Sequence, residues 1–381
     1  MPMPIYLDYN ATTPVAPEVA EAIRPYLYER YGNPSSSHAY GRIAREAVEQ
    51  ARGQVAMLLG ARPDEIVLMG CATEASNLAL LGAARTASAD RRHLVTSAVE
   101  HPAVLEPVKR LVAEGWQATI LPVDETGRVA VDAVAAALRP DTALVSVMHA
   151  NNEVGTIQPI AQIAALTRPR GILLHTDAAQ SVAKIPVDVD ALGVDLLSIA
   201  GHKFYATKGV GALYVRPGVR LSPPTAGADQ EHGLRAGTEN VPAIVGLGEA
   251  ARIARERMRE TPGHLVAMRD RLHAALQRTV PGLLLNGHSV ERLPSTLNVS
   301  FPNVSGRALL QAVDDTVAAS VGSACHSEND SVSGVLAAMQ FGAARAMGAV
   351  RLSVGGPTTA PEVDTAAAAL ASAWARLAGS R

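Results

Sequence analysis

Two segments, "GILLHTDA" at residues 171–178 and "VDLLSIAG" at residues 194–201, decide the fold of this chain. Both are short apolar runs without polar alternation, which is typical of strands buried on both faces of a sheet. Four further runs have the same character, at residues 65–69, 93–99, 142–150 and 211–216. Amphipathic helical patterns, such as residues 41–60 and 131–140, lie between them. This alternation predicts an α/β fold around a mostly parallel sheet.

The pattern changes after about residue 241. A long helix is expected over residues 243–258, and only two strand-like segments follow it, "TLNVSF" (296–301) and "AVRLSVG" (349–355). An alanine-rich helix is expected from about Pro361 to the end. We therefore predict a large domain over residues 14–259 and a smaller α+β domain formed by residues 1–13 together with residues 260–381.

Composition and charge exclude several classes of protein. The chain has 381 residues, 48% of them hydrophobic, which is enough for two cores. Its net charge is −2, and without a basic block we expect no direct binding to nucleic acid or to an anionic membrane. No apolar run reaches the roughly 18 to 20 residues of a membrane helix, and a cytoplasmic protein is expected. Cys71 and Cys325 are the only cysteines, which excludes a disulfide framework and a cysteine-based zinc site.

Polar residues lie at or just after the ends of the predicted strands. Thr73 opens a helix whose free N–H groups suit an anion, although an ordinary strand-to-helix turn would look the same. His101 follows the next strand and would, alone, be read as a satisfied polar residue. Asp177 closes an apolar strand, where a carboxylate needs either an ion pair within the protein or a protonated ring nitrogen of a cofactor. Gln180 lies one helical turn later and could bind the same ring.

Lys203 follows the strand at 194–201 and is one of only four lysines among the 34 Lys and Arg residues. Arginine can replace lysine at a surface but cannot act as an amine nucleophile. Ends of neighbouring strands meet in one crevice, so Lys203 and Asp177 are expected to face each other there. An exposed surface lysine is the alternative. With His101 and the anion-binding turn, this set matches pyridoxal phosphate: a Schiff-base lysine, a carboxylate for the pyridinium and a stacking ring.

Ten ordered motifs between Tyr6 and about Thr359 resemble one family. They are "YLDYNATTP", "GNPSS", "ATEASNLAL", "EHPAV", "HANNEVG", "HTDAAQ", "GHKFY", "RAGTEN", "SVGSACHS" and "RLSVG". Together they are similar to the class V, fold-type I pyridoxal phosphate enzymes, specifically the cysteine desulfurases and their relatives the selenocysteine lyases. The resemblance implies a large domain with a mostly parallel seven-stranded sheet and a smaller α+β domain.

The resemblance also implies how the cofactor is held. Lys203 would be the Schiff-base lysine and proton shuttle, Asp177 and Gln180 the ring partners, and His101 the stacking and acid/base residue. The implied phosphate ligands are Ala72, Thr73, His202 and, from a neighbouring subunit, Thr238. A homodimer follows from that last role.

On the substrate side, the resemblance implies that Asn152 contacts the ring and the substrate, and that Arg351 clamps the substrate carboxylate. Cys325 occupies the nucleophile position of the family, in a polar stretch that suggests a mobile loop. The implied reaction releases L-alanine from L-cysteine and leaves a persulfide on Cys325. Whether His326 lowers the pKa of the Cys325 thiol is left open.

Several positions depart from the family pattern. Cys71 stands where the phosphate turn usually has glycine, and Ala200 replaces a frequent serine that would donate to the phosphate. Gly356 takes the place of an arginine, and the loops at 204–211 and 226–233 differ from their usual forms. Each departure is tolerable alone, and together they allow weaker cofactor binding or altered specificity.

The sequence therefore leaves three interpretations of the function. The leading one is a pyridoxal phosphate-dependent cysteine desulfurase, and the second is a selenocysteine lyase, which the match around Cys325 favours. The third is a non-catalytic relative that binds partners, against which the joint presence of the site residues argues. The sulfur acceptor, whether an iron–sulfur scaffold, a tRNA-thiolation protein or another carrier, is left open by the sequence.

Overall fold

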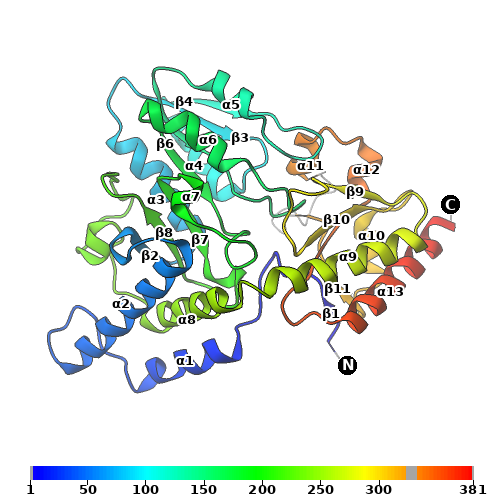
Figure 1. Ribbon diagram of the computed structural model, residues 1–381, viewed down its shortest axis with the longest axis horizontal. Coiled ribbons are helices and arrows are strands. Elements are labelled where there is room, and N and C mark those ends of the chain that lie inside the picture. Colours follow the sequence, from blue (N-terminus) through cyan, green and yellow to red (C-terminus); the bar gives the residue numbers. More distant parts are fainter. Residues whose placement is uncertain (1–2, 323–332, 380–381) are drawn as a thin grey trace.

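The computed structural model describes residues 3–322 and 333–379. Its larger sheet, on the left in Figure 1, has seven strands in the order β2-β8-β7-β6-β5-β3-β4. Its strands are β2 (Ile66–Met69), β3 (His93–Ser97), β4 (Gln117–Leu121), β5 (Thr142–Ser146), β6 (Leu173–Asp177), β7 (Leu196–Ala200) and β8 (Gly211–Val215). Neighbours pair in parallel except where β8 meets β2 and β7. The predicted α/β fold around a mostly parallel sheet is therefore confirmed.

Helices cover both faces of this sheet. They are α1 (Pro17–Tyr28), α2 (Ala39–Leu59), α3 (Ala72–Thr86), α4 (Pro102–Ala113), α5 (Val131–Ala137), α6 (Ile160–Thr167), α7 (Val189–Leu192) and α8 (Val241–Arg257). Neighbouring residues of β2 face opposite ways: Val67 belongs to a hydrophobic cluster with α3 and α4, whereas Leu68 belongs to one with α2 and α8. Burial on both faces explains why most of these strands show no alternation of apolar and polar residues.

Short 3₁₀ turns connect several elements: Pro63–Glu65, Arg168–Arg170, Gly201–Lys203 and Gln230–Gly233. Helix α2 ends at Gly60, whose φ of 69° is the left-handed conformation that glycine adopts without strain. The turn at Gly201–Lys203 directly follows β7, and it therefore places Lys203 at the carboxyl end of the sheet.

The rest of the chain is built around a smaller antiparallel sheet. Its strands are β9 (Leu284–Asn286), β10 (Thr296–Ser300) and β12 (Ala349–Ser353), in the order β12-β10-β9. The long helices α9 (Thr261–Thr279) and α13 (Ala360–Gly379) lie side by side against it (Figure 1). The shorter helices are α10 (Gly306–Gln311), α11 (Gly334–Ala338) and α12 (Ala343–Met347). Leu7 joins the hydrophobic cluster of this part, although it comes from the start of the chain.

The first residues of the chain cross between the two sheets. Strand β1 (Ile5–Tyr6) pairs in parallel with β11 (Val317–Ala318), and Asp8 forms a bridge with Ser353 at the end of β12. The backbone then reaches the large sheet, where Thr13 N–H donates to His202 O at 2.9 Å. This path brings Asp8, Asn10 and Ala11 to the carboxyl ends of the large-sheet strands.

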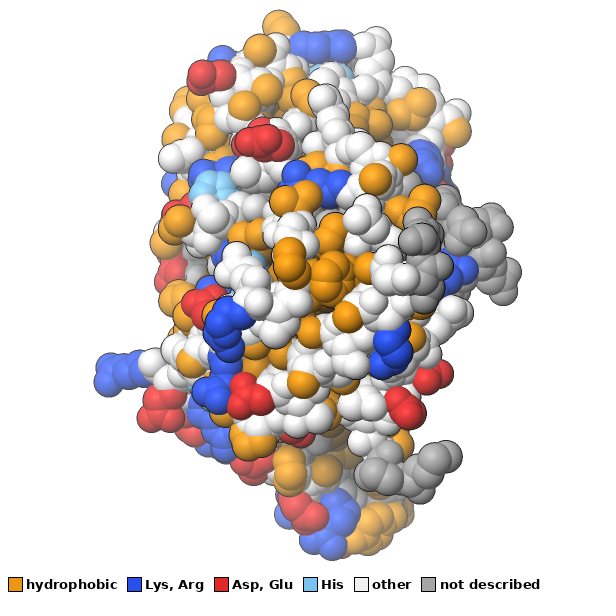
Figure 2. Space-filling view, turned by 90° about the vertical axis from the view of Figure 1, so that its right-hand side faces the viewer, with side chains coloured by type: hydrophobic (Ala, Val, Ile, Leu, Met, Phe, Trp, Pro, Cys, Tyr) orange, Lys and Arg blue, Asp and Glu red, His pale blue; other side chains and the backbone are white. Residues whose placement is uncertain are grey.

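Strand β4 is the one strand of the large sheet without a predicted run. Its side chains are mostly exposed or half-buried, unlike those of β2 at the opposite edge, so the segment "QATIL" has no continuous apolar character. Among the described residues, no helix is long and apolar enough to span a membrane. On the face shown in Figure 2, acidic and basic side chains are interspersed and form no field of a single sign.

Candidate functional site

A cavity of about 250 Å³ lies at the carboxyl ends of the large-sheet strands. It is lined by residues that follow β2, β3, β5, β6 and β7, by the start of the chain, and by β12. The structure brings most of the predicted site residues together here: Ala72, Thr73, His101, Asn152, Asp177, Gln180, His202, Lys203 and Arg351. This is the crevice in which parallel α/β sheets bind ligands.

Lys203 enters the cavity from the 3₁₀ turn after β7. Its Nζ donates to Asn10 O at 2.6 Å and to Ala11 O at 2.9 Å, so two backbone carbonyls of the first residues hold the amine. The neighbouring His202 ring contacts Thr12 Oγ1 through Nδ1 at 3.1 Å. Burial, with the nearby lysine charges, lowers the pKa of His202 to about 4, so this ring is neutral near pH 7.

Asp177 ends β6 with a side chain that is almost fully buried. One of its oxygens accepts from Ala179 N–H at 2.9 Å. Burial raises the pKa of this carboxyl, while the charges of His101 and Lys203 oppose the rise. Among the described residues Asp177 has no ion pair within 4 Å, and the cationic groups whose charges act on it are His101 and Lys203. The carboxylate therefore faces a cavity that can take a cationic ligand group.

His101 caps helix α4, where its Nδ1 accepts from Ala103 N–H at 3.1 Å. The other ring nitrogen, Nε2, then carries the proton in the neutral ring. Burial lowers the pKa of His101; the charge of Asp177 opposes this effect, and that of Lys203 adds to it. The side chain also borders a second, larger cavity of about 930 Å³, so His101 stands between the two spaces.

The start of α3 lines the cavity with Cys71, Ala72 and Thr73. A helix of 15 residues presents its first N–H groups and its positive dipole end there, which suits an anion such as a phosphate. Cys71 has φ −174° and ψ 170°, an extended conformation that any residue adopts, and its Sγ accepts from Glu74 N–H at 3.4 Å. The replacement of glycine at this position therefore strains nothing in the turn.

Two other departures from the family pattern, Gly356 and the loop at 226–233, make specific contacts in the structure. Gly356 N–H donates to the Tyr205 hydroxyl at 2.7 Å. In the loop at 226–233, Glu231 is buried and pairs with Arg52 at 2.6 Å, and it also accepts from Leu68 N–H at 2.7 Å. This buried pair ties the altered loop to α2 and β2.

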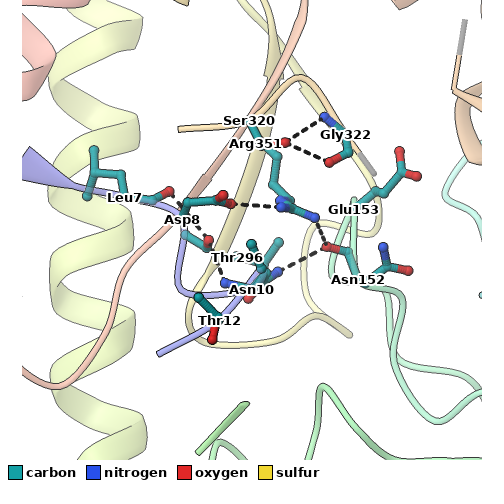
Figure 3. Close-up of polar contacts among 12 residues, drawn as sticks. Leu7, Asp8, Asn10, Thr12, Asn152, Glu153, Thr296, Ser320, Gly322 and Arg351 are labelled. Carbon is teal, nitrogen blue, oxygen red and sulfur yellow. Dashed lines mark hydrogen bonds and ion pairs between the residues drawn. The ribbon is translucent and has the colours of Figure 1, made fainter. Parts of the chain in front are cut away.

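Arg351 reaches the cavity from the middle of β12, with a side chain only 3% exposed. Its Nη2 forms an ion pair with Asp8 Oδ1 at 2.7 Å, and its Nη1 donates to Asn152 O at 3.1 Å (Figure 3). Asn10 Nδ2 donates to the same carbonyl at 3.1 Å. The predicted substrate-binding arginine thus already has an anionic partner supplied by the chain itself.

Sequence reasoning missed three residues that organise the site. Asn10 uses its backbone carbonyl to accept from Lys203 and from Gln180 Nε2, the latter at 2.9 Å. Lys184 is buried and donates to Gln180 Oε1 at 2.8 Å. Asp8 pairs with Arg351. Asp8 and Asn10 lie in the motif "YLDYNATTP", which was the one signal that could have marked them.

Two predicted residues are not part of this cluster. Thr238 lines a separate recess of about 90 Å³ beside Arg235 and Glu239, and does not border the Lys203 cavity. Cys325 lies outside the described residues, between the segments that end at Gly322 and resume at Ser333. Both flanking residues border the larger cavity next to His101.

The chain is similar to known proteins over nearly all of its length. Residues 5–365 match the aminotransferase class-V family model. The chain is 49% identical to the cysteine desulfurase IscS of Anaeromyxobacter dehalogenans, over 96% of this chain and 91% of the relative. It is 45% identical to that of Dictyoglomus turgidum, over 94% and 92%.

Comparison with solved structures points to the same group of proteins. A NifS-like protein superposes with a TM-score of 0.91 at 38% identity, covering 99% of this chain and 100% of that one. SspA in complex with cysteine superposes with a TM-score of 0.82 at 36% identity, covering 93% and 99%. The family predicted from the motifs is confirmed: the chain belongs to the aminotransferase class-V family and, within it, to the cysteine desulfurases.

Proposed function

We propose that this enzyme converts L-cysteine to L-alanine at the Lys203 cavity and keeps the sulfur as a persulfide on Cys325. The observation that carries the proposal is the buried Asp177 carboxylate, which has no ion pair among the described residues and shares a cavity with a lysine amine. Relatives named cysteine desulfurase, and a related structure in complex with cysteine, support L-cysteine as the substrate.

The site residues fit pyridoxal phosphate, the cofactor that the family implies. When bound, it supplies an electron sink that allows the substrate α-proton to leave. Asp177 is suited to a protonated ring nitrogen because its own burial demands a cation. The α3 N-terminus with Ala72 and Thr73, together with His202, would hold the phosphate, and the flat His101 ring would cover the cofactor.

The chain's own groups then divide the remaining tasks. Lys203 Nζ would hold the cofactor and carry the substrate α-proton. Gln180 and Asn152 would contact the cofactor ring and so fix its orientation. Arg351 would bind the substrate carboxylate, since guanidinium and carboxylate match in a bidentate geometry. The Cys325 thiol takes the substrate sulfur: the Cβ–S bond of L-cysteine breaks, an S–S bond forms on Cys325, and the thiol proton ends on L-alanine.

We also propose a homodimer. Thr238 lies in a recess apart from the Lys203 cavity of its own chain, which supports a role toward the phosphate bound in a second copy. Analytical ultracentrifugation is expected to give a dimer.

The finer assignments belong to the same proposal. The enzyme would act in the cytoplasm, with residues 14–259 as the cofactor-binding domain and residues 1–13 with 260–381 as the smaller one. A sulfur-acceptor protein would take the persulfide sulfur, for iron–sulfur cluster assembly or tRNA thiolation.

The test is alanine release from L-cysteine and, separately, from L-selenocysteine, with a reductant present. Wild type is expected to absorb at ~400 nm and to release alanine from L-cysteine, because a lysine-bound cofactor gives that band. Lys203→Ala should lose the band, and Cys325→Ala should keep the band but lose turnover of L-cysteine. Alanine from L-selenocysteine alone would reject the desulfurase reading in favour of a lyase.

A further inference from the structure

The ion pair between Asp8 and Arg351 stands at the junction of two cavities. Arg351 lines the 250 Å³ cavity with Lys203, while Asp8 lines the adjoining 930 Å³ cavity. Asn152 borders both, and its carbonyl accepts from Arg351 Nη1 (Figure 3). A carboxylate that enters from the larger cavity therefore meets the guanidinium beside Asp8.

The two partners differ in their access to water. The Arg351 side chain is 3% exposed and that of Asp8 is 20% exposed. A buried guanidinium needs a countercharge at all times, because leaving it alone in a low-dielectric interior is costly. Asp8, by contrast, can turn toward solvent. Arg351 is its single side-chain partner in the described part of the chain.

The guanidinium also has unused donor capacity. The Arg351 Nε is buried and has no hydrogen-bond partner within residues 3–322 and 333–379. The present contacts use Nη1 for a backbone carbonyl and Nη2 for one oxygen of Asp8. A free α-carboxylate, which is not tied to a backbone, could take two parallel N–H donors where Asp8 takes one.

We propose that Asp8 is an internal stand-in for the substrate carboxylate: it pairs with Arg351 in the ligand-free site and is exchanged for the α-carboxylate of the incoming amino acid. The inference rests on the proposed function, since it takes Arg351 as the substrate-binding arginine. The exchange keeps the buried cation paired throughout, and Asp8 weakens substrate binding because the substrate must compete with it. Asp8 is thus a positioning residue that sets affinity for amino acids with a free carboxylate.

The test removes the charge of Asp8 and keeps its shape. Asp8→Asn can still accept a hydrogen bond from Arg351 but no longer neutralises it. The matched control is Asp364→Asn, which removes a carboxylate from the exposed pair with Arg271, where the side chains are 49% and 51% exposed. For each cofactor-loaded protein, the Kd of L-alanine and of L-alaninamide is measured by thermal shift, and KM and kcat are measured with L-cysteine.

Asp8→Asn is expected to bind L-alanine about threefold to tenfold more tightly, with a lower KM for L-cysteine and a smaller change in kcat. L-Alaninamide, which lacks the carboxylate, should bind wild type and variant alike, and Asp364→Asn should match wild type. Unchanged or weaker L-alanine binding in Asp8→Asn overturns the exchange, because Asp8 would then only hold Arg351 in place.

A second variant, Asp8→Ser, guards against a folding defect. If neither variant folds without ligand, recovery of folding with L-alanine but not with L-alaninamide supports the exchange, and lack of recovery overturns it. The two proposals fail separately. A wild type that releases no alanine from L-cysteine refutes the function, whereas normal turnover with L-alanine binding unchanged in Asp8→Asn refutes only the exchange.

Discussion

Replacing Lys184 by methionine perturbs a buried amine directly behind the site. Lys184 Nζ donates to Gln180 Oε1 at 2.8 Å and to Asn10 Oδ1 at 3.4 Å, and the side chain is almost fully buried. Burial, together with the charges of Lys203 and Arg351, lowers the pKa of Lys184 from 10.5 to about 7. Methionine has a similar length and no charge to desolvate.

The lowered pKa makes stability depend on pH with a definite sign. Between pH 7 and pH 10.5 the unfolded chain holds the Lys184 proton and the folded protein does not, so the free energy of unfolding rises with pH. One pKa unit corresponds to about 1.4 kcal/mol, and Lys184 therefore contributes a gain of about 2 kcal/mol between pH 7 and pH 9. Lys184→Met removes this gain, because its side chain does not titrate.

The assay is urea unfolding of wild type and Lys184→Met at pH 7 and pH 9, at one protein concentration. The difference between the two proteins isolates Lys184, since the other titrating groups are common to both. Wild type should gain about 2 kcal/mol more than the variant between the two pH values. An equal gain in both proteins would refute the reasoning, because the amine would then titrate alike in the folded and unfolded chains.

Three further outcomes are expected. Asp177→Asn should lower alanine release by at least about 100-fold and weaken cofactor binding, since a neutral amide cannot compensate a ring cation; activity within a few-fold of wild type would contradict this role. Arg52→Ala should cost about 3 to 5 kcal/mol in urea unfolding because it strands the buried Glu231 charge, whereas Arg271→Ala, at an exposed pair, should cost under about 1 kcal/mol. Cys71→Gly should leave the Kd of pyridoxal phosphate within about twofold, as the backbone there is already unstrained; a large gain in affinity would show that the cysteine hinders the phosphate turn.

The sequence predicted the large sheet well because its strands are buried on both faces. Short segments such as 171–178 and 194–201, which lack the alternation of apolar and polar residues, favour buried strands because they are too short for helices and lie between helical patterns. Strand β4 was missed because two of its five side chains are exposed and two are half-buried, so its sequence is not apolar throughout. Strand β9, with three residues, is too short to carry a pattern.

The site could be predicted where it depends on strand ends. Asp177 and Lys203 follow adjacent strands, so their convergence in one cavity needed only the rule for parallel sheets. The support around them depends on contacts between distant segments. Asn10 meets Lys203, and Asp8 meets Arg351, only because the first residues cross from the small sheet to the large one. No local pattern encodes that path.

The most direct test of the central claim is a single turnover of L-cysteine without reductant, followed by mass spectrometry of the peptide that contains Cys325. The account predicts one alanine released for each sulfur atom added to Cys325, and neither product in Lys203→Ala. Alanine released without added sulfur on Cys325, or released equally by Cys325→Ala, would contradict it.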